Sequence, residues 1–139
     1  MEGNQTFTIL KPETVERNLV GSIIAKITEN GFSIRALKLT KLKKEQAEAF
    51  YAIHKGKEFY ERLIRFMTAG PIVVAILEKD NAVKEFRQLI GTTNPAKADE
   101  GTIRHLYGEN TTLNAIHGSD SDENAMHECD FFFSQLERF

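Results

Sequence analysis

Apolar residues recur along the chain with two spacings, and a spacing of two marks the segments that we expect to be strands. Residues 5–11 alternate around Phe7 and Ile9 and stop at Pro12, which has no backbone N–H to donate to a sheet. Three further strands are predicted, at residues 32–42, 72–77 and 114–117. The alternation changes step near the middle of residues 32–42, which indicates a bulge. Residues 72–77 are apolar at every position, as in strands buried on both faces.

A spacing of three and four residues predicts helices between these strands. Asn18 is placed to cap the first helix, which ends at Gly31. Residues 44–53 and 58–67 have the same spacing and are separated by a glycine-containing turn, so we expect a helical hairpin. Two more helices are expected later in the chain, and both begin at a capping side chain.

Asn81 precedes a helix that ends at Gly91, and Ser121 precedes one that runs toward Phe131. Residues 92–112 have no regular pattern, and a stretch of this length is more often functional than idle. The order of elements predicts an α+β sandwich, with the helices on one face of a mostly antiparallel sheet. No repeat or linker divides the chain, so a single domain over residues 1–139 is expected.

Composition and charge restrict the function classes. Lys and Arg number 18 against 20 Asp and Glu, so there is no global positive field and duplex nucleic acid is not an expected partner. The first residues lack the features of a secretory signal, and no apolar stretch is long enough to span a bilayer. Cys129 is the only cysteine, which fits a reducing compartment. We predict a cytoplasmic protein without a membrane partner.

Among the four histidines, His117 has the context of a reactive side chain. It ends a short apolar strand and precedes Gly118-Ser119-Asp120-Ser121, a turn that leaves its ring open to a ligand. His54 and His127 lie in predicted helices among polar neighbours, where solvation is the ordinary interpretation. His117 can serve as nucleophile, base or metal ligand, but no second His or Cys lies at the spacing of a zinc site.

A histidine that attacks a phosphate needs an orienting partner and nearby cations. Glu128 can fold back from the last helix as the orienting carboxylate, or it is one of several solvated acids. Arg87 and Arg104 bracket the irregular segment, and guanidinium groups suit phosphate oxygens, although an exposed arginine is ordinarily solvated. Lys11 places a positive charge at the end of the first strand, where sites are commonly built.

Seven motifs follow one another in a fixed order. The most specific is residues 114–121, Asn-Ala-Ile-His-Gly-Ser-Asp-Ser. The other six are Lys11-Pro12, Leu19-Val20-Gly21, His54-Lys55-Gly56, Met67-Thr68-Ala69-Gly70-Pro71, Gly91-Thr92-Thr93-Asn94-Pro95 and Gly101-Thr102-Ile103-Arg104. Through these motifs the chain resembles the nucleoside diphosphate kinases over nearly its whole length.

The resemblance implies a ferredoxin-like core with a four-stranded antiparallel sheet and a ping-pong reaction. A nucleoside triphosphate, ATP included, phosphorylates the histidine, and a nucleoside diphosphate then collects the group. His117 takes the place of the nucleophile, Glu128 matches the acid that orients the imidazole, and Ser119 matches the hydroxyl beside it. Lys11 and Tyr51 correspond to residues near the transferring phosphate, where they would stabilise developing negative charge.

The resemblance also implies the nucleotide site. The residues that match the phosphate-binding set are Arg87, Thr93 and Arg104. Phe59 corresponds to the aromatic residue that stacks on the base, a contact that tolerates every base and so implies broad specificity. Asn114 and Lys11 match the residues that reach the ribose hydroxyls. Mg²⁺ is carried mainly by the nucleotide phosphates, so no metal-ligating residue is expected.

Seven residues in four places depart from the usual family pattern. Glu13-Thr14 replaces Asp-Gly, and Glu58 replaces a proline. His105-Leu106-Tyr107 stands where Gly-Asp-Phe is common, and Leu113 stands where an arginine is common. These changes remove no reacting group, and they bear on subunit contacts more than on chemistry. A homo-oligomer is expected, a hexamer before a tetramer.

Two other interpretations lead to different functions. The first is a catalytically silent nucleotide-binding or interaction module, although such proteins usually lose a reacting residue and none is lost here. The second is single-stranded nucleic-acid binding as an added activity, for which the sequence has no basic stripe.

Overall fold

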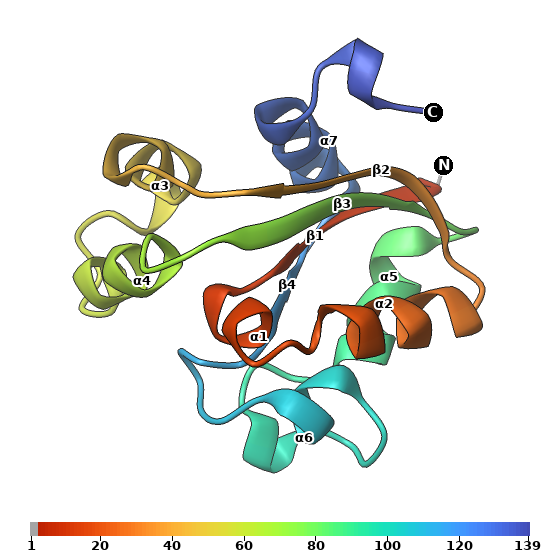
Figure 1. The fold of residues 1–139 in the computed structure, drawn as a ribbon, viewed down its shortest axis with the longest axis horizontal. Helices are drawn as coiled ribbons and strands as arrows, with labels where there is room; N and C mark the ends of the chain where they lie inside the picture. Colours follow the sequence, from red (N-terminus) through yellow and green to blue (C-terminus); the bar gives the residue numbers. More distant parts are fainter. Residues whose placement is uncertain (1–2) are drawn as a thin grey trace.

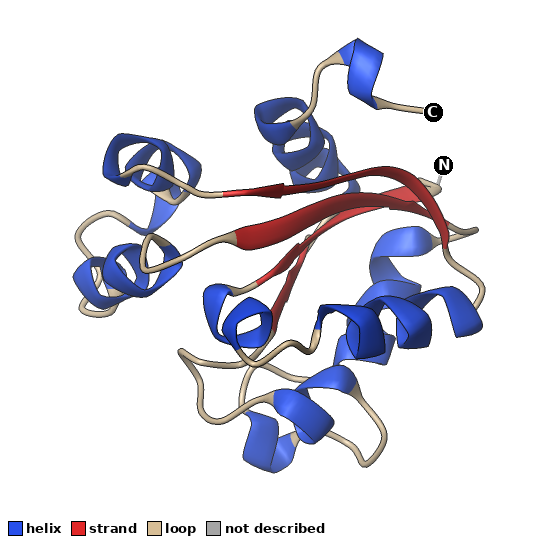
Figure 2. Ribbon diagram, in the orientation of Figure 1, coloured by secondary structure: helices blue, strands red, loops and turns tan. Residues whose placement is uncertain are grey.

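The computed structural model describes residues 3–139, and these form one antiparallel sheet with helices packed around it (Figures 1 and 2). Its strands are β1 (Gln5–Leu10), β2 (Ser33–Thr40), β3 (Ile72–Glu78) and β4 (Ile116–Gly118). Their order across the sheet is β2-β3-β1-β4, so β2 and β4 lie at the edges. Every neighbouring pair is antiparallel, which confirms the predicted α+β class and four-stranded sheet.

Seven α-helices connect or follow these strands within residues 3–139. They are α1 (Pro12–Glu16), α2 (Val20–Glu29), α3 (Lys44–Phe50), α4 (Tyr60–Met67), α5 (Ala82–Ile90), α6 (Ile103–Tyr107) and α7 (Asp122–Phe132). Shorter 3₁₀ turns lie at Ala52–His54, Pro95–Lys97 and Gln135–Glu137. No helix in the described part of the chain has the length and apolar character needed to cross a membrane.

The helices cover both faces of the sheet (Figure 1). On one face, α3, α4 and α7 contribute to a core cluster that includes Phe7 and Ile76. On the other face, α2, α5 and α6 contribute to a second cluster that includes Leu77 and Phe86. The prediction that the helices lie on one face is therefore wrong.

The cause lies in β3, whose alternate residues enter different clusters. Ile76 belongs to the first cluster and Leu77 to the second, and both side chains are almost fully buried. Burying one such side chain contributes about 1.5–3 kcal/mol. A strand that is apolar on both sides therefore needs a layer of helices on each face.

The structure confirms the predicted bulge and one of the three predicted helix caps. The predicted bulge in β2 is confirmed as a register shift between Ile34 and Ala36. Ser121 caps α7 by accepting a hydrogen bond from the backbone N–H of Asn124 at 3.0 Å. Asn18 and Asn81, in contrast, accept no capping bond and have φ angles of 57° and 55°. Asparagine tolerates this left-handed conformation, so both residues turn the chain before a helix instead of capping it.

The segment from residue 92 to 112 is more ordered than the sequence suggested. It contains a 3₁₀ turn and α6, which has five residues. Helix α1, also five residues long, follows β1 directly and was not predicted. A helix of that length presents too few residues for a hydrophobic period to appear.

Candidate active site

A cavity of about 850 Å³ opens between the α3–α4 hairpin and the segment 111–114, beside β4 and α7. Nine of the ten site residues predicted from the sequence line it, and the tenth, Ser119, is buried behind them. The nine are Lys11, Tyr51, Phe59, Arg87, Thr93, Arg104, Asn114, His117 and Glu128. The fold thus brings together side chains from seven separate segments of the chain.

His117 lies on β4, opposite Ile9 of β1, with about a fifth of its side chain exposed. Its Nε2 is 2.9 Å from Oε1 of Glu128 on α7. A carboxylate accepts hydrogen bonds, so this contact favours the tautomer in which Nε2 carries the proton. Nδ1 then keeps its lone pair, and it has no hydrogen-bond partner among residues 3–139. An imidazole in this state can act as a nucleophile.

Glu128 is itself held in place by Ser119. The Ser119 hydroxyl donates to Oε1 of Glu128 at 2.6 Å and accepts a hydrogen bond from the backbone N–H of Phe7 at 3.3 Å. The carboxylate is therefore tied to the central strand β1 as well as to α7. These contacts fix the orientation of the His117 ring from its Nε2 side.

Lys11 carries a buried positive charge at the end of β1, as predicted. Its Nζ donates to Oδ1 of Asn114 at 2.7 Å and to the carbonyl of Thr112 at 3.4 Å. Burial lowers the pKa of Lys11 to about 8, Glu13 partly opposes this, and Arg104 lowers the pKa further. An anionic ligand near Nζ would stabilise the charged form of Lys11, which burial disfavours.

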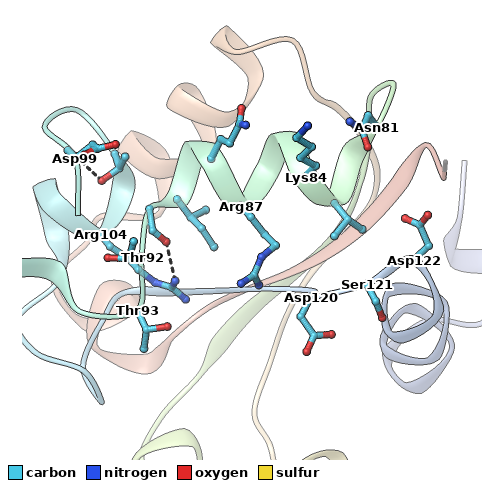
Figure 3. A pocket seen from close by; sticks show the side chains of 15 residues that line it. Asn81, Lys84, Arg87, Thr92, Thr93, Asp99, Arg104, Asp120, Ser121 and Asp122 are labelled. Atoms are coloured by element: carbon cyan, nitrogen blue, oxygen red, sulfur yellow. Dashed lines mark hydrogen bonds between the residues drawn. The ribbon is translucent and has the colours of Figure 1, made fainter. Parts of the chain in front are cut away.

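Arg104 and Arg87 form a second cationic group. Arg104 donates to the carbonyls of Gly91 at 2.9 Å and Ile116 at 2.8 Å, and burial, together with Arg87, lowers its pKa to about 10. Arg87 forms no ion pair within the described residues. A neighbouring cavity of about 560 Å³ shares four lining residues with the first, namely Arg87, Arg104, Thr93 and Asp120. Figure 3 shows the Arg87 side chain extending from α5 into the space between Thr93 and Asp120. Two adjacent guanidinium groups favour the binding of a polyanion.

The opposite wall carries two aromatic residues with different environments. Tyr51 is buried, and burial together with the Glu128 carboxylate raises its pKa well above the usual value. Its phenol therefore stays protonated and can donate a hydrogen bond. Phe59 is 39% exposed at the mouth of the cavity, with its ring centroid 5.3 Å from that of His54. An exposed aromatic face of this kind is suited to stacking.

Several residues that line the cavity were not predicted as site residues. They include His54, Arg62, Thr112, Asp120 and His127. Burial and Lys57 lower the pKa of His54, and Asp120 opposes them. His54 belongs to one of the quoted motifs, which was the only signal for it. From the sequence, His54 and His127 were interpreted as solvated because their neighbours in the predicted helices are polar.

Comparison with known protein families shows which family the chain belongs to. A family model described as nucleoside diphosphate kinase matches residues 4–138. The chain belongs to the nucleoside diphosphate kinase family. It is 51% identical over 137 residues to the nucleoside diphosphate kinase of Persephonella marina, covering 99% of this chain and 98% of the relative. It is 53% identical over 133 residues to that of Chloroherpeton thalassium, covering 96% and 94%.

Solved structures of nucleoside diphosphate kinases have the same fold. The enzyme of Aquifex aeolicus superposes with a TM-score of 0.95 at 38% identity, covering 98% of this chain and 99% of that one. The Halobacterium salinarum enzyme, solved in complex with CDP, gives 0.94 at 34% identity, covering 99% and 92%. The ferredoxin-like core expected from the resemblance is thereby confirmed. The chain is an enzyme that transfers phosphoryl groups between nucleotides.

The positions that depart from the nucleoside diphosphate kinase pattern lie outside the reacting groups. Glu13 accepts a hydrogen bond from the backbone N–H of Ala115 at 3.2 Å. His105 is exposed on α6 and does not line the cavity, and Tyr107 packs against the second core cluster. Neither of these two side chains reaches His117.

Proposed function

We propose that the protein transfers the terminal phosphoryl group of a nucleoside triphosphate to a nucleoside diphosphate through a phosphohistidine on Nδ1 of His117. The observation that supports this role most directly is the contact between Nε2 and Glu128, because it favours the tautomer that leaves the Nδ1 lone pair free on a residue that lines the cavity. Nδ1 attacks the γ-phosphorus, and the bond from that phosphorus to the β,γ-bridging oxygen breaks. The diphosphate departs with the electron pair, and a second diphosphate reverses these events.

Cations and hydroxyls around His117 fit a transferring phosphoryl group. Lys11 brings a buried ammonium, which Asn114 orients from the side. Tyr51 offers a protonated phenol, and Arg87 and Arg104 bring guanidinium groups to the same cavity. We assign these residues, with Thr93, to phosphate binding and to stabilising the charge of the transition state.

The remaining part of the cavity is suited to a nucleoside. We assign Phe59 to stacking on the base, and Asn114 with Lys11 to the ribose hydroxyls. Stacking on one exposed ring requires no particular base, so broad base specificity follows. The CDP complex of the relative from Halobacterium salinarum supports binding of nucleoside diphosphates in this fold.

We propose Mg²⁺ as the cofactor, carried by the nucleotide. Residues 3–139 contain no group of three or more His, Cys, Asp or Glu side chains arranged to hold a metal ion. The cavity residues fit a metal ion that enters bound to the nucleotide phosphates. The cations on the cavity walls suit the phosphates, and Asp120 is a nearby carboxylate that suits the metal ion. When bound, the ion neutralises part of the phosphate charge.

The test of this function is a labelling experiment. Incubation of the protein with ATP labelled in the γ-phosphate is expected to give a protein-bound label that is labile to acid and stable to alkali. Addition of any nucleoside diphosphate should discharge the label as the corresponding triphosphate. Nucleotide binding without label would instead favour a catalytically silent module.

The pH profile of the reaction follows from Lys11. Its ammonium is needed to bind phosphate, and its pKa in the free protein is about 8. The charged form is therefore lost as the pH rises through 8, and kcat/KM is expected to decline above that value. Steady-state rates between pH 7 and 10 measure this decline, and a flat profile over that range would contradict the role of Lys11.

We also propose a homo-oligomer, with a hexamer ahead of a tetramer. Leu37 and Leu39 are 49% and 65% exposed on the edge strand β2, where a second copy could cover them. Multi-angle light scattering is expected to give about six times the mass of one chain. A monomer at micromolar concentration would exclude the proposal.

Two further assignments stay predictions. A single domain over residues 1–139 is supported by the family match, which spans residues 4–138. A cytoplasmic location is favoured by the single cysteine, Cys129, which is buried and unpaired.

A further inference from the structure

Arg62 lines the nucleotide cavity beside the proposed base platform. Helix α4 begins at Tyr60, directly after Phe59. Side chains three and four positions apart lie on one helical face, so Arg62 and Leu63 stand one turn beyond Phe59. All three line the cavity, while Tyr60 and Ile64 point into the core. The Lys57 Nζ lies 5.8 Å from the centroid of the Phe59 ring, but Lys57 does not line the cavity, so Arg62 is the cation beside the base platform on the cavity wall.

This cation is not committed to another contact. Arg62 is exposed, and its guanidinium has no hydrogen bond or ion pair with any of residues 3–139. The other arginine of α4, Arg65, does not line the cavity and lies over the ring of Phe66, 5.6 Å from its centroid. Of the two arginines on α4, only Arg62 thus lines the cavity.

Arg62 also stands apart from the phosphate-binding cations. Arg87 is close enough to Arg104 to lower its pKa, and Arg104 acts in the same way on Lys11. Arg62 is not among the groups that shift either pKa. It follows Phe59 by three residues and precedes Leu63, and both of these line the cavity, which places Arg62 beside the proposed base platform.

A guanidinium group discriminates between bases because it has donors and no acceptor. Guanine presents two adjacent acceptors, O6 and N7, which match the guanidinium fork, whereas adenine replaces O6 with an amino donor. Thr111 and Thr112 also line the cavity, but a hydroxyl both donates and accepts and so favours neither base. The acceptors of guanine are therefore the natural partners of Arg62.

We propose that Arg62 is a specificity-determining residue that hydrogen-bonds O6 and N7 of guanine. Guanine nucleotides are then the preferred substrates among the several that the protein accepts. This inference rests on the proposed function, in particular on the stacking of the base on Phe59. Broad specificity is retained because the stack itself tolerates every base.

The test compares acceptors that differ in one atom or group. The phosphorylated protein is mixed with GDP, IDP, 7-deaza-GDP or ADP, and the rate of discharge is followed at low acceptor concentration. GDP and IDP, which share O6 and N7, are expected to react roughly 5- to 10-fold faster than ADP. 7-Deaza-GDP lacks N7 and is expected to lose most of this advantage.

Substitution of Arg62 assigns the preference to its side chain. In Arg62→Ala the GDP to ADP ratio is expected to fall to about one because the GDP rate falls more than the ADP rate, whereas Arg65→Ala should keep the ratio of the unaltered protein. Equal losses for GDP and ADP in Arg62→Ala would overturn the proposal, as would a ratio near one in the unaltered protein.

A second measurement separates this inference from the proposed function. Calorimetric titration of GDP and ADP into the unaltered and Arg62→Ala proteins requires no turnover. If no phosphorylated protein forms, the proposed function fails, and the two affinities still decide the role of Arg62. A GDP preference that disappears in Arg62→Ala supports the role, and unchanged affinities overturn it.

Discussion

Replacing His117 by asparagine is expected to abolish labelling by γ-labelled ATP and to lower kcat by at least ~10⁴-fold. Asparagine has a side-chain amide that can still donate to Glu128, so the wall of the cavity is retained. It has no basic nitrogen to attack phosphorus, and no covalent intermediate can form. The measurements are labelling under acid-free conditions and steady-state phosphoryl transfer from ATP to GDP.

His105→Asn is the matched control for this variant. His105 is exposed on α6 and lies outside the cavity, so its replacement should leave labelling at the level of the unaltered protein. Circular dichroism and nucleotide binding confirm that His117→Asn is folded. Full labelling of a folded His117→Asn protein would show that the nucleophile is another residue.

Lys11→Met is expected to give the second largest loss, a fall of about 10²- to 10³-fold in the rate of phosphohistidine formation. Methionine keeps most of the apolar stem of Lys11 and removes the buried ammonium that we assign to the transferring phosphoryl group. The charge is costly to bury, as its lowered pKa indicates, so the fold should tolerate its removal. Stopped-flow measurement of the half-reaction with ATP separates this loss from product release.

The control is Lys41→Met, because Lys41 is exposed in the segment between β2 and α3. Its rate should match that of the unaltered protein. The decline of kcat/KM above pH 8 should also disappear in Lys11→Met and persist in Lys41→Met. A loss confined to KM in Lys11→Met would mean that Lys11 binds the nucleotide without stabilising the transition state.

The sequence predicted best where a pattern has one structural solution. The unbroken apolar run of β3 identified a buried strand, and the Ser121 cap identified the start of α7. Helices α1 and α6 were missed because five residues are too few to establish a period. The prediction that all helices lie on one face of the sheet was wrong, because the order of helices and strands along the chain does not determine which face each helix covers.

The candidate site was predictable through its motifs more than through its physics. Local context singled out His117, but it left Glu128 indistinguishable from a solvated acid. The contact between them depends on α7 folding back beside β1, which no local pattern encodes. Arg62 was missed for the same reason, since on α4 it has the spacing of an ordinary solvent-facing residue.

With Lys11 in the phosphate-binding role proposed above, its buried ammonium couples nucleotide binding to the proton content of the solution. In the free protein at pH 8, about half of the molecules have a neutral Lys11, because its pKa is about 8. Bound phosphate favours the charged form, so each binding event draws a fraction of a proton from the buffer. The heat of binding will therefore contain the ionisation enthalpy of whichever buffer is used. Nucleotide affinity will weaken as solutions become more alkaline, although no contact to the nucleotide is lost.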